Sequence, residues 1–322
     1  METKVKVGID ISKGTFDVAL PVLEKPEYLH KKFANNESGF KKFYNVLPKE
    51  CHCVMEASGV YYLPLATFLF NKGVDVSVVN PLTIKHFARM RLMRTKTDRK
   101  DSMLIAQYGK TENPPLWKVK PSYLLELQQI QALLDNFTKE RTRLINQREA
   151  FTNSGIENKI VSKSLTREIN NKEKQIKLLE TEMEKITMEN HPELFERLKS
   201  VPGIGKRTAM MLIVVTDGFT KFENSKQLSA YIGLCPRIFE SGTSVKGKSR
   251  ICKMGMGRMR ALLYLCAMRA KQCNLGCRTM FERLKAKGKN GKLILIALAN
   301  KLLRQVFAIG TGQNYYSEIS PI

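Results

Sequence analysis

The first eighty residues contain five short strand patterns, and their order restricts the folds open to this chain. The strand patterns lie at residues 5–10, 15–20, 28–33, 51–55 and 74–79, and helical patterns lie at residues 37–47 and 62–71. The first two strand patterns are close enough to form a hairpin, whereas a helical pattern separates the last two. An apolar run such as residues 74–79 is typical of a parallel strand buried on both faces.

Three strands followed by alternating helix and strand are the order of a ribonuclease-H-like, or RuvC-like, fold. We therefore predict an α/β domain of this type over residues 1–120. Helical patterns predominate in the rest of the chain. They predict a helical arm over residues 121–192 and a mainly helical C-terminal domain over residues 193–322.

Four acidic residues lie where such an α/β domain would bring them to one edge of its sheet. Asp10 and Glu56 each end a predicted strand, and Asp98 and Asp101 are spaced to share one face of a helix. Carboxylate oxygens suit Mg²⁺, and two such ions about 3.5–4 Å apart clamp the attacking and leaving oxygens of a phosphoryl transfer. The four acids are therefore candidate metal ligands and catalytic residues, with two Mg²⁺ ions per site.

Other interpretations of these acids remain open at this point. Each acid alone is more often an exposed carboxylate, and Asp98 and Asp101 also suit a helix N-terminus or ion pairs with nearby cations. Sugar kinases and actin-like ATPases begin with a similar strand and acid. They need further glycine-rich phosphate loops, and residues 1–120 contain none that we identify. The pattern favours the core of a metal-dependent nuclease or recombinase.

The formal net charge of +24 indicates a polyanionic partner. Nucleic acid is the commonest such partner, because cationic side chains displace its condensed counterions, and an anionic membrane surface is the alternative. We expect no membrane association, since no apolar run looks long enough to span a bilayer and no signal peptide is apparent. The seven scattered cysteines are typical of a reducing compartment, so we expect a cytoplasmic, nucleoid-associated protein.

Basic residues gather in three segments that are candidates for nucleic-acid binding. One is the run at residues 85–100, and another is an expected irregular loop at residues 237–260. Between them, residues 198–209 resemble a helix-hairpin-helix element, whose glycines permit a tight turn and whose following helix can bind a phosphate. The candidate residues are Arg89, Arg94, Lys96, Gly203, Gly205, Lys206, Arg237, Lys246, Lys248, Arg250, Lys253 and Arg258.

The predicted arm has two apolar seams at close to heptad spacing, separated by a break at residues 154–155. The seams consist of Leu127, Ile130, Leu134, Phe137, Leu144 and Phe151, and of Leu165, Ile169, Ile176, Leu179, Met183 and Ile186. This pattern predicts an antiparallel helical hairpin or coiled coil. Packing within one chain and self-association both remain open.

Ser241 lies in the basic loop and is a candidate nucleophile. A serine attacks phosphorus only with help from a base or an electrophile, which neighbouring cations and a metal would supply. Taken alone, a serine before a glycine is more often a turn residue, and Ser244 and Ser249 compete for the same role.

Together these residues resemble the DEDD-type transposases of insertion sequences that use a bridge RNA, which are related to the Piv-type DNA invertases. The resemblance covers nearly the whole chain and depends on the order and spacing of several short motifs. The motifs are Gly8-Ile9-Asp10-Ile11-Ser12-Lys13, Met55-Glu56-Ala57-Ser58-Gly59, Lys96-Thr97-Asp98-Arg99-Lys100-Asp101, Val201-Pro202-Gly203-Ile204-Gly205, and Gly233-Leu234-Cys235-Pro236 followed by Ser241-Gly242.

The resemblance implies a RuvC-like domain, a coiled-coil insertion and a C-terminal transposase domain in a bacterial or archaeal protein. It implies that Asp10, Glu56, Asp98 and Asp101 bind metal, and that Ser241 attacks DNA to form a covalent phosphoserine. It further implies a homo-oligomer, a dimer or tetramer, in which carboxylates and serine meet across subunits. A structured RNA would pair with donor and target DNA.

One segment departs from the family pattern, because the usual Ile-Ser-Lys-type stretch reads Ile251-Cys252-Lys253-Met254-Gly255. Two other functions remain open at this point. One is a structure-specific endonuclease that uses metal-activated water, in which Ser241 is only structural. The other is a non-catalytic protein that binds nucleic acid.

Overall fold

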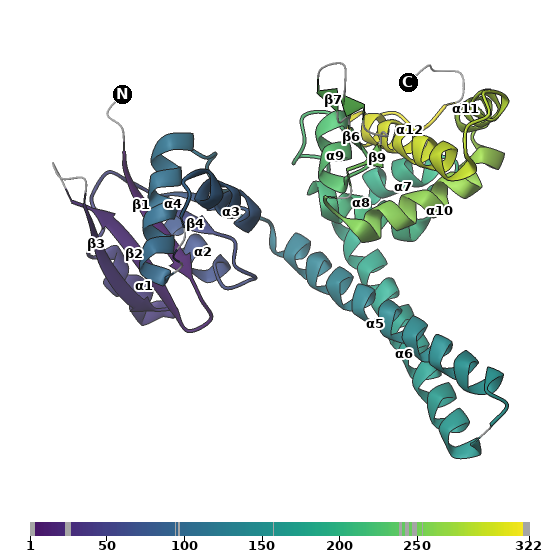
Figure 1. The fold of residues 1–322 in the computed structure, drawn as a ribbon, viewed down its shortest axis with the longest axis horizontal. Coiled ribbons are helices and arrows are strands. Elements are labelled where there is room, and N and C mark those ends of the chain that lie inside the picture. The colour runs from purple at the N-terminus through teal and green to yellow at the C-terminus, as the bar shows by residue number, and fades with distance from the viewer. Residues whose placement is uncertain are drawn as a thin grey trace. The chain divides into compact units, whose positions relative to one another are not determined.

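A computed structural model describes residues 4–22, 27–93, 95, 97–156, 158–237, 240–241, 245–246, 250–252 and 254–317, with only the backbone described at 240–241, 245–246 and 250. The chain divides into two compact units, Met1–Lys120 and Pro121–Ile322 (Figure 1). The first unit contains a mixed five-stranded sheet with helices, and the second is mainly helical.

The sheet of the first unit has the strand order β3-β2-β1-β4-β5. Its strands are β1 (Val5–Ile11), β2 (Thr15–Pro21), β3 (Tyr28–Ala34), β4 (Cys51–Glu56) and β5 (Asp75–Val79). The first three strands pair antiparallel, and β4 joins β1 and β5 in parallel. All five strands predicted from the sequence are therefore confirmed, as is the ribonuclease-H-like order.

Helices cover both faces of this sheet. The first pair, α1 (Glu37–Tyr44) and α2 (Leu63–Asn71), packs on the side of Ile9, and the second pair, α3 (Pro81–Met90) and α4 (Asp98–Glu112), packs with Val54 and Val79 on the other. Alternate residues of a strand point to opposite faces, which is why consecutive residues of β4 enter different cores. Helix α3 was not predicted, although Asn80 caps it and Pro81 begins it, which is a standard start signal.

The second unit begins with two 32-residue helices, α5 (Ser122–Asn153) and α6 (Lys159–Asn190), that pack antiparallel (Figure 1). Ion pairs join them, including Arg141 to Glu173, and Lys172 lies over the Phe137 ring at 4.4 Å. The helices that follow are α7 (Pro192–Ser200), α8 (Lys206–Thr216), α9 (Ser225–Ile232), α10 (Gly257–Cys273), α11 (Leu275–Ala286) and α12 (Gly291–Thr311).

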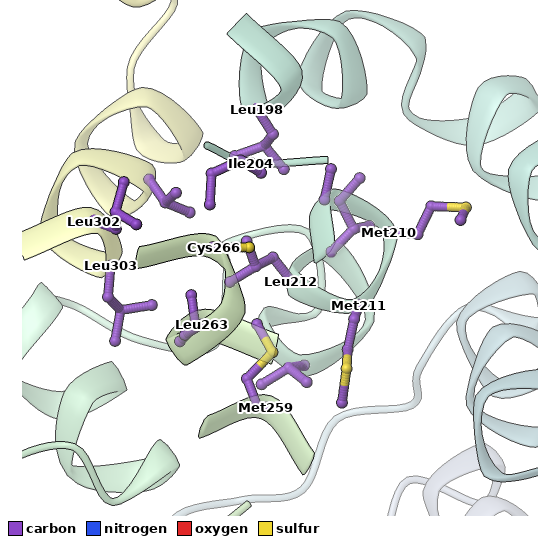
Figure 2. Packing of buried hydrophobic residues seen from close by; sticks show 14 of the residues in the cluster. Leu198, Ile204, Met210, Met211, Leu212, Met259, Leu263, Cys266, Leu302 and Leu303 are labelled. Carbon is purple, nitrogen blue, oxygen red and sulfur yellow. The ribbon is translucent and has the colours of Figure 1, made fainter. Parts of the chain in front are cut away.

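The core of this unit lies between α8, α10 and α12. Figure 2 shows Leu263 and Cys266 of α10 among labelled residues of α8 and α12. Every residue of α8 from Thr208 to Thr216 is buried, which explains its lack of a polar face. Leu127 and Met183, at the base of the two long helices, belong to the same core, so that the arm is anchored by continuous packing.

Three expectations need correction. Phe151 of the first seam is 44% exposed, since it lies at the far end of α5, beyond the well-covered part of the pair.

The segment expected to be irregular contains two short ladders, β6 (Pro236–Arg237) with β9 (Arg250–Ile251), and β7 (Glu240–Ser241) with β8 (Val245–Lys246). Within the described residues, α12 is long and apolar enough to cross a membrane by length and composition, although half of that stretch is buried inside the unit.

Candidate active site

Strand register places two of the predicted acids side by side. β1 and β4 run parallel with Ile9 opposite Met55, so that Asp10 and Glu56 occupy the next matching positions. Adjacent strands are about 4.7–4.9 Å apart, and residues opposite one another project from the same face. Asp10 and Glu56 therefore emerge together at the carboxyl ends of two central strands.

Helix α4 brings the other two acids to the same end. A Cβ on Gly8 of β1 would lie 2.1 Å from the Ser102 carbonyl oxygen, and a Cβ on Gly109 would lie 2.7 Å from Val54. The same Cβ on Gly109 would lie 3.8 Å from the Lys6 Cβ, so Gly109 packs near the start of β1, whereas residues 102–106 pack over its middle. The helix runs antiparallel to β1, and its first turn, with Asp98 and Asp101, lies toward Asp10.

The charges at this edge interact strongly. The pKa of Asp10 is raised from 3.8 to about 6, first by burial and then by repulsion from Asp101, Glu56, Asp98 and Asp17. Each of these neighbours is an acid, so the protonated form of Asp10 is favoured. The structure therefore brings the four sequence-predicted acids into one electrostatic neighbourhood.

The donor set of this neighbourhood fits a divalent metal ion. Its side chains are all carboxylates, which are the hard oxygen ligands that Mg²⁺ prefers, and their mutual repulsion is the charge that a cation would neutralise. Among the described residues, however, no three acidic, histidine or cysteine side chains are close enough to form a ready-made ligand set.

A fifth acid, Asp17, was missed in the sequence. It lies directly opposite Asp10 in the β1–β2 hairpin and is buried. His30 Nε2 is 2.7 Å from its carboxylate and Lys32 Nζ is 3.4 Å away. The same Lys32 nitrogen is 3.9 Å from Asp98. The signal was present, because a hairpin that turns at Lys13-Gly14 pairs residue 10 with residue 17.

Replacing Lys32 with methionine should lower the free energy of unfolding by about 1 kcal/mol at low salt, because it leaves the buried Asp17 carboxylate only partly compensated. The half-exposed position of Lys32 keeps this value small. Adding Asp17→Asn should restore most of the loss. Lys31→Met is the matched control, since Lys31 pairs with Val18 on the opposite face of β3. Equal urea unfolding curves for Lys32→Met and the wild type would contradict this assignment.

The raised pKa of Asp10 also predicts how stability depends on pH. The ordinary pKa is 3.8 and the folded value is about 6, so this group stabilises the fold below pH 3.8 and loses that contribution as pH rises through 6. Asp10→Asn cannot ionise. Its stability advantage over the wild type should be small at pH 4 and reach about 1–3 kcal/mol at pH 7 without metal. Urea unfolding at both values measures the difference.

Buried His52 is a second titrating group, whose pKa burial and Lys6 lower from 6.5 to about 4. It acts in the opposite direction, because its stability contribution is lost as pH falls below 6.5. His52 is the same in both proteins and cancels from the comparison. An advantage of Asp10→Asn that does not grow between pH 4 and pH 7 would refute the raised pKa of Asp10.

The remaining candidates lie in several places. Arg89 is exposed on α3, Gly203 has a positive φ of 102° in the turn before α8, and Gly205 caps α8. Lys206 pairs with Glu184 of α6 at 2.6 Å, and Arg258 pairs with Asp135 of α5 at 3.0 Å. Both cations thus hold the arm to the C-terminal helices, and phosphate binding by them would compete with these pairs.

The basic loop is described only in part. Ser241 pairs with Val245 in the β7–β8 ladder, Lys246 belongs to β8, and Arg250 pairs with Arg237 in the β6–β9 ladder. Arg94, Lys96, Lys248 and Lys253, together with the competing Ser244 and Ser249, lie outside the described residues. Ser241 belongs to the second compact unit, whereas all four acids belong to the first.

A ribonuclease-H-like sheet that ends in Asp10 and Glu56, with Asp98 and Asp101 on the helix above, defines the DEDD class of nuclease folds. Residues 7–153 match the transposase family DEDD_Tnp_IS110, and residues 195–282 match the family described as Transposase IS116/IS110/IS902. The chain belongs to this IS110 family of DEDD transposases.

Several relatives match over most of their length. The pilin gene-inverting protein of Moraxella lacunata is 33% identical over 323 residues, which cover 95% of this chain and 96% of the relative. The transposase for insertion sequence element IS1111A of Coxiella burnetii is 27% identical over 82% of this chain and 78% of the relative. The transposase for insertion sequence element IS1328 of Yersinia enterocolitica is 26% identical over 97% of this chain and 98% of the relative.

Proposed function

We propose that this protein cuts and rejoins donor and target DNA through a covalent phosphoserine intermediate on Ser241, guided by a structured RNA. The observation that carries the proposal is the register of β1 and β4 beneath α4, which gathers Asp10, Glu56, Asp98 and Asp101. Membership of a transposase family and the net charge of +24 support DNA as the substrate.

Asp10, Glu56, Asp98 and Asp101 would hold the metal. A divalent cation bound there supplies positive charge to the phosphate and lowers the pKa of an attacking hydroxyl. The chain itself contributes rigid positioning, because two of the ligands end strands of one sheet and the other two share the first turn of one helix. Lys32 forms ion pairs with Asp17 and with Asp98, so it offsets part of the negative charge of this group.

In the proposed step, Ser241 Oγ attacks a DNA phosphorus. A bond forms between phosphorus and the serine oxygen, the bond to one DNA oxygen breaks, and the serine proton ends on the departing DNA hydroxyl. The number of phosphoester bonds is unchanged, so that a second DNA hydroxyl can attack the phosphoserine and release the enzyme without an external energy source. Cations of the 237–260 loop would stabilise the charge on phosphorus.

Transposition and DNA inversion can share this chemistry. A relative that covers nearly the whole chain is a pilin gene-inverting protein, whereas others are transposases. Excision and inversion differ in the relative orientation of the two DNA sites, while the cutting and joining step is the same. We propose transposition as the natural outcome and a homo-oligomer as the active form, as the resemblance to the DEDD-type transposases implies.

The test combines two readouts on protein purified with its nucleic acid. The first is an adduct that resists denaturation, formed with Mg²⁺ and a supercoiled plasmid that carries the gene and its flanking DNA. The second is sequencing of co-purified RNA. An adduct together with one enriched structured RNA supports the proposal. Cleavage without an adduct would favour an endonuclease that uses water, and binding without cleavage would favour a non-catalytic protein. An adduct formed equally well after RNase treatment would show that the reaction does not need an RNA guide.

A further inference from the structure

Leu92, just after α3, has an unusual backbone conformation for its residue type. Four described residues other than glycine have a positive φ: Leu92 at 53°, Asn113 at 42°, Asp217 at 50° and Phe219 at 65°. Asparagine and aspartate tolerate this region, because their short polar side chains form local hydrogen bonds. Phe219 is strained but buried, and its ring packs against Phe307 at 6.1 Å. Leu92 is 83% exposed and gains no such burial.

The conformation comes from the way in which α3 ends. The Leu92 N–H donates to the Arg89 carbonyl at 3.0 Å, and the Met93 N–H donates to the Ala88 carbonyl at 3.1 Å. This pair of bonds is the Schellman cap, whose left-handed position is usually occupied by glycine. Glycine would adopt it without the clash that a Cβ introduces. A leucine here therefore lowers the stability of the protein, and no burial of its side chain in the described chain compensates for this loss. Such strain points to a role for the side chain.

The neighbouring side chains define the partner's chemistry. Met90 and Met93 are also exposed, and with Leu92 they form a small apolar tip. Arg89 and Arg91 are exposed beside it, and the Arg91 guanidinium stacks on Phe87 at 5.2 Å. These exposed arginines complement the phosphates of DNA, in keeping with the net charge of +24. Apolar wedges flanked by cations are typical of proteins that unstack DNA bases.

The length of the intervening chain limits how far the tip lies from the acids. Asp98 follows Leu92 by six residues, a span of at most about 22 Å when fully extended. That span equals roughly six nucleotides of a DNA strand, at 3.4 Å each. A DNA strand whose scissile phosphate lies at the four acids could therefore present its nearby bases to Leu92.

We propose that Leu92, supported by Met90 and Met93, is an apolar wedge that packs against unstacked bases of the DNA within about six nucleotides of the scissile phosphate. This inference rests on the proposed function in that DNA is the substrate. The wedge lowers the free energy needed to distort the DNA near the cutting site. The strained backbone at Leu92 keeps this side chain exposed, at the expense of the stability of the protein without DNA.

The test uses a DNA duplex with 2-aminopurine in a central TA step, because such steps unstack most easily. Wild-type protein at saturation should raise the fluorescence several-fold. Leu92→Gly and Leu92→Asn should bind within about threefold of the wild-type affinity and lose most of the rise. Both variants should melt at the wild-type temperature or slightly above it, since each residue tolerates a positive φ.

Two control variants show whether the fluorescence rise depends on the Leu92 side chain. Leu82→Asn changes a leucine that is also exposed, at the other end of α3, and should keep the full fluorescence rise. Asp10→Asn should also keep the rise while losing cleavage, so that a failure of the proposed chemistry and a failure of the wedge give different results. A rise that persists in both Leu92 variants would overturn the proposal. A melting temperature of the Leu92 variants that is many degrees below the wild type would also overturn it. So would a fluorescence rise that the wild type gives only with RNA, or Leu92 variants that keep the full rise but change the self-association of the protein.

Discussion

Replacing Asp10 with asparagine is expected to lower the rate of DNA cleavage and joining at least about 10³-fold, which corresponds to about 4 kcal/mol of transition-state stabilisation. Asp10 lies near the end of the central strand of the sheet and is the acid on which burial and the charges of Asp101, Glu56 and Asp98 act together. Asparagine keeps the shape but removes the charge that would hold a divalent cation. The measurement is the initial rate of product formation from the supercoiled plasmid at saturating Mg²⁺.

Asp75→Asn is the matched control for this prediction. Asp75 is also an acid on a strand of the same sheet, but it begins β5 and pairs with Lys4 at 2.6 Å. It should retain cleavage within about twofold, with at most about 1 kcal/mol lost from stability. Similar rates for Asp10→Asn and the wild type would exclude the carboxylate site. Comparable losses in Asp10→Asn and Asp75→Asn would indicate that the sheet, and not the site, had been damaged.

Replacing Ser241 with alanine is expected to abolish the covalent protein–DNA adduct and to reduce strand joining to background, a loss of at least about 10⁴-fold. The variant lacks the oxygen that would carry the phosphoryl group, and this loss alone prevents formation of the adduct. Ser241 lies in the short β7–β8 ladder, where alanine is compatible with the backbone, so that DNA binding should persist. The measurement is the fraction of labelled DNA that remains attached to protein after denaturation.

Ser244→Ala and Ser249→Ala control for the other serines of the loop and should leave the adduct intact. Asp10→Asn should also lose the adduct, because the proposed attack depends on both units. If Ser241→Ala still cleaves DNA at close to the wild-type rate while Asp10→Asn does not, water is the nucleophile and the protein is an endonuclease. If Ser244→Ala alone loses the adduct, the nucleophile has been assigned to the wrong serine.

The strands of the first unit were predictable because their signals are local. Residues 5–10, 15–20 and 51–55 carry apolar side chains at the spacing that a two-faced sheet requires, and each corresponds to an observed strand. The acids that end β1 and β4 were recognisable for the same reason. Local signals failed where charge obscured them, as in α3, which the basic run at residues 85–100 concealed.

The second unit was harder to predict. The helical arm was visible from its apolar spacing, but the ladders that carry Arg237 and Ser241 are two residues long and have no periodicity to detect. The pairing of Lys206 with Glu184 and of Arg258 with Asp135 was equally invisible, because it joins residues on different helices. Phosphate binding by these two cations remains a prediction.

The amino-acid sequence by itself determined the five strands of the first unit, the helical arm, the family and the choice of the four acids as candidates, because these depend on side-chain type and short-range spacing. Only the tertiary structure decided that Asp10 stands beside Glu56, that α4 runs antiparallel to β1, and that Leu92 is strained and exposed. Strand register and helix direction arise from contacts between residues distant in the chain, such as Gly8 with Ser102. A pattern read along the chain does not contain such contacts.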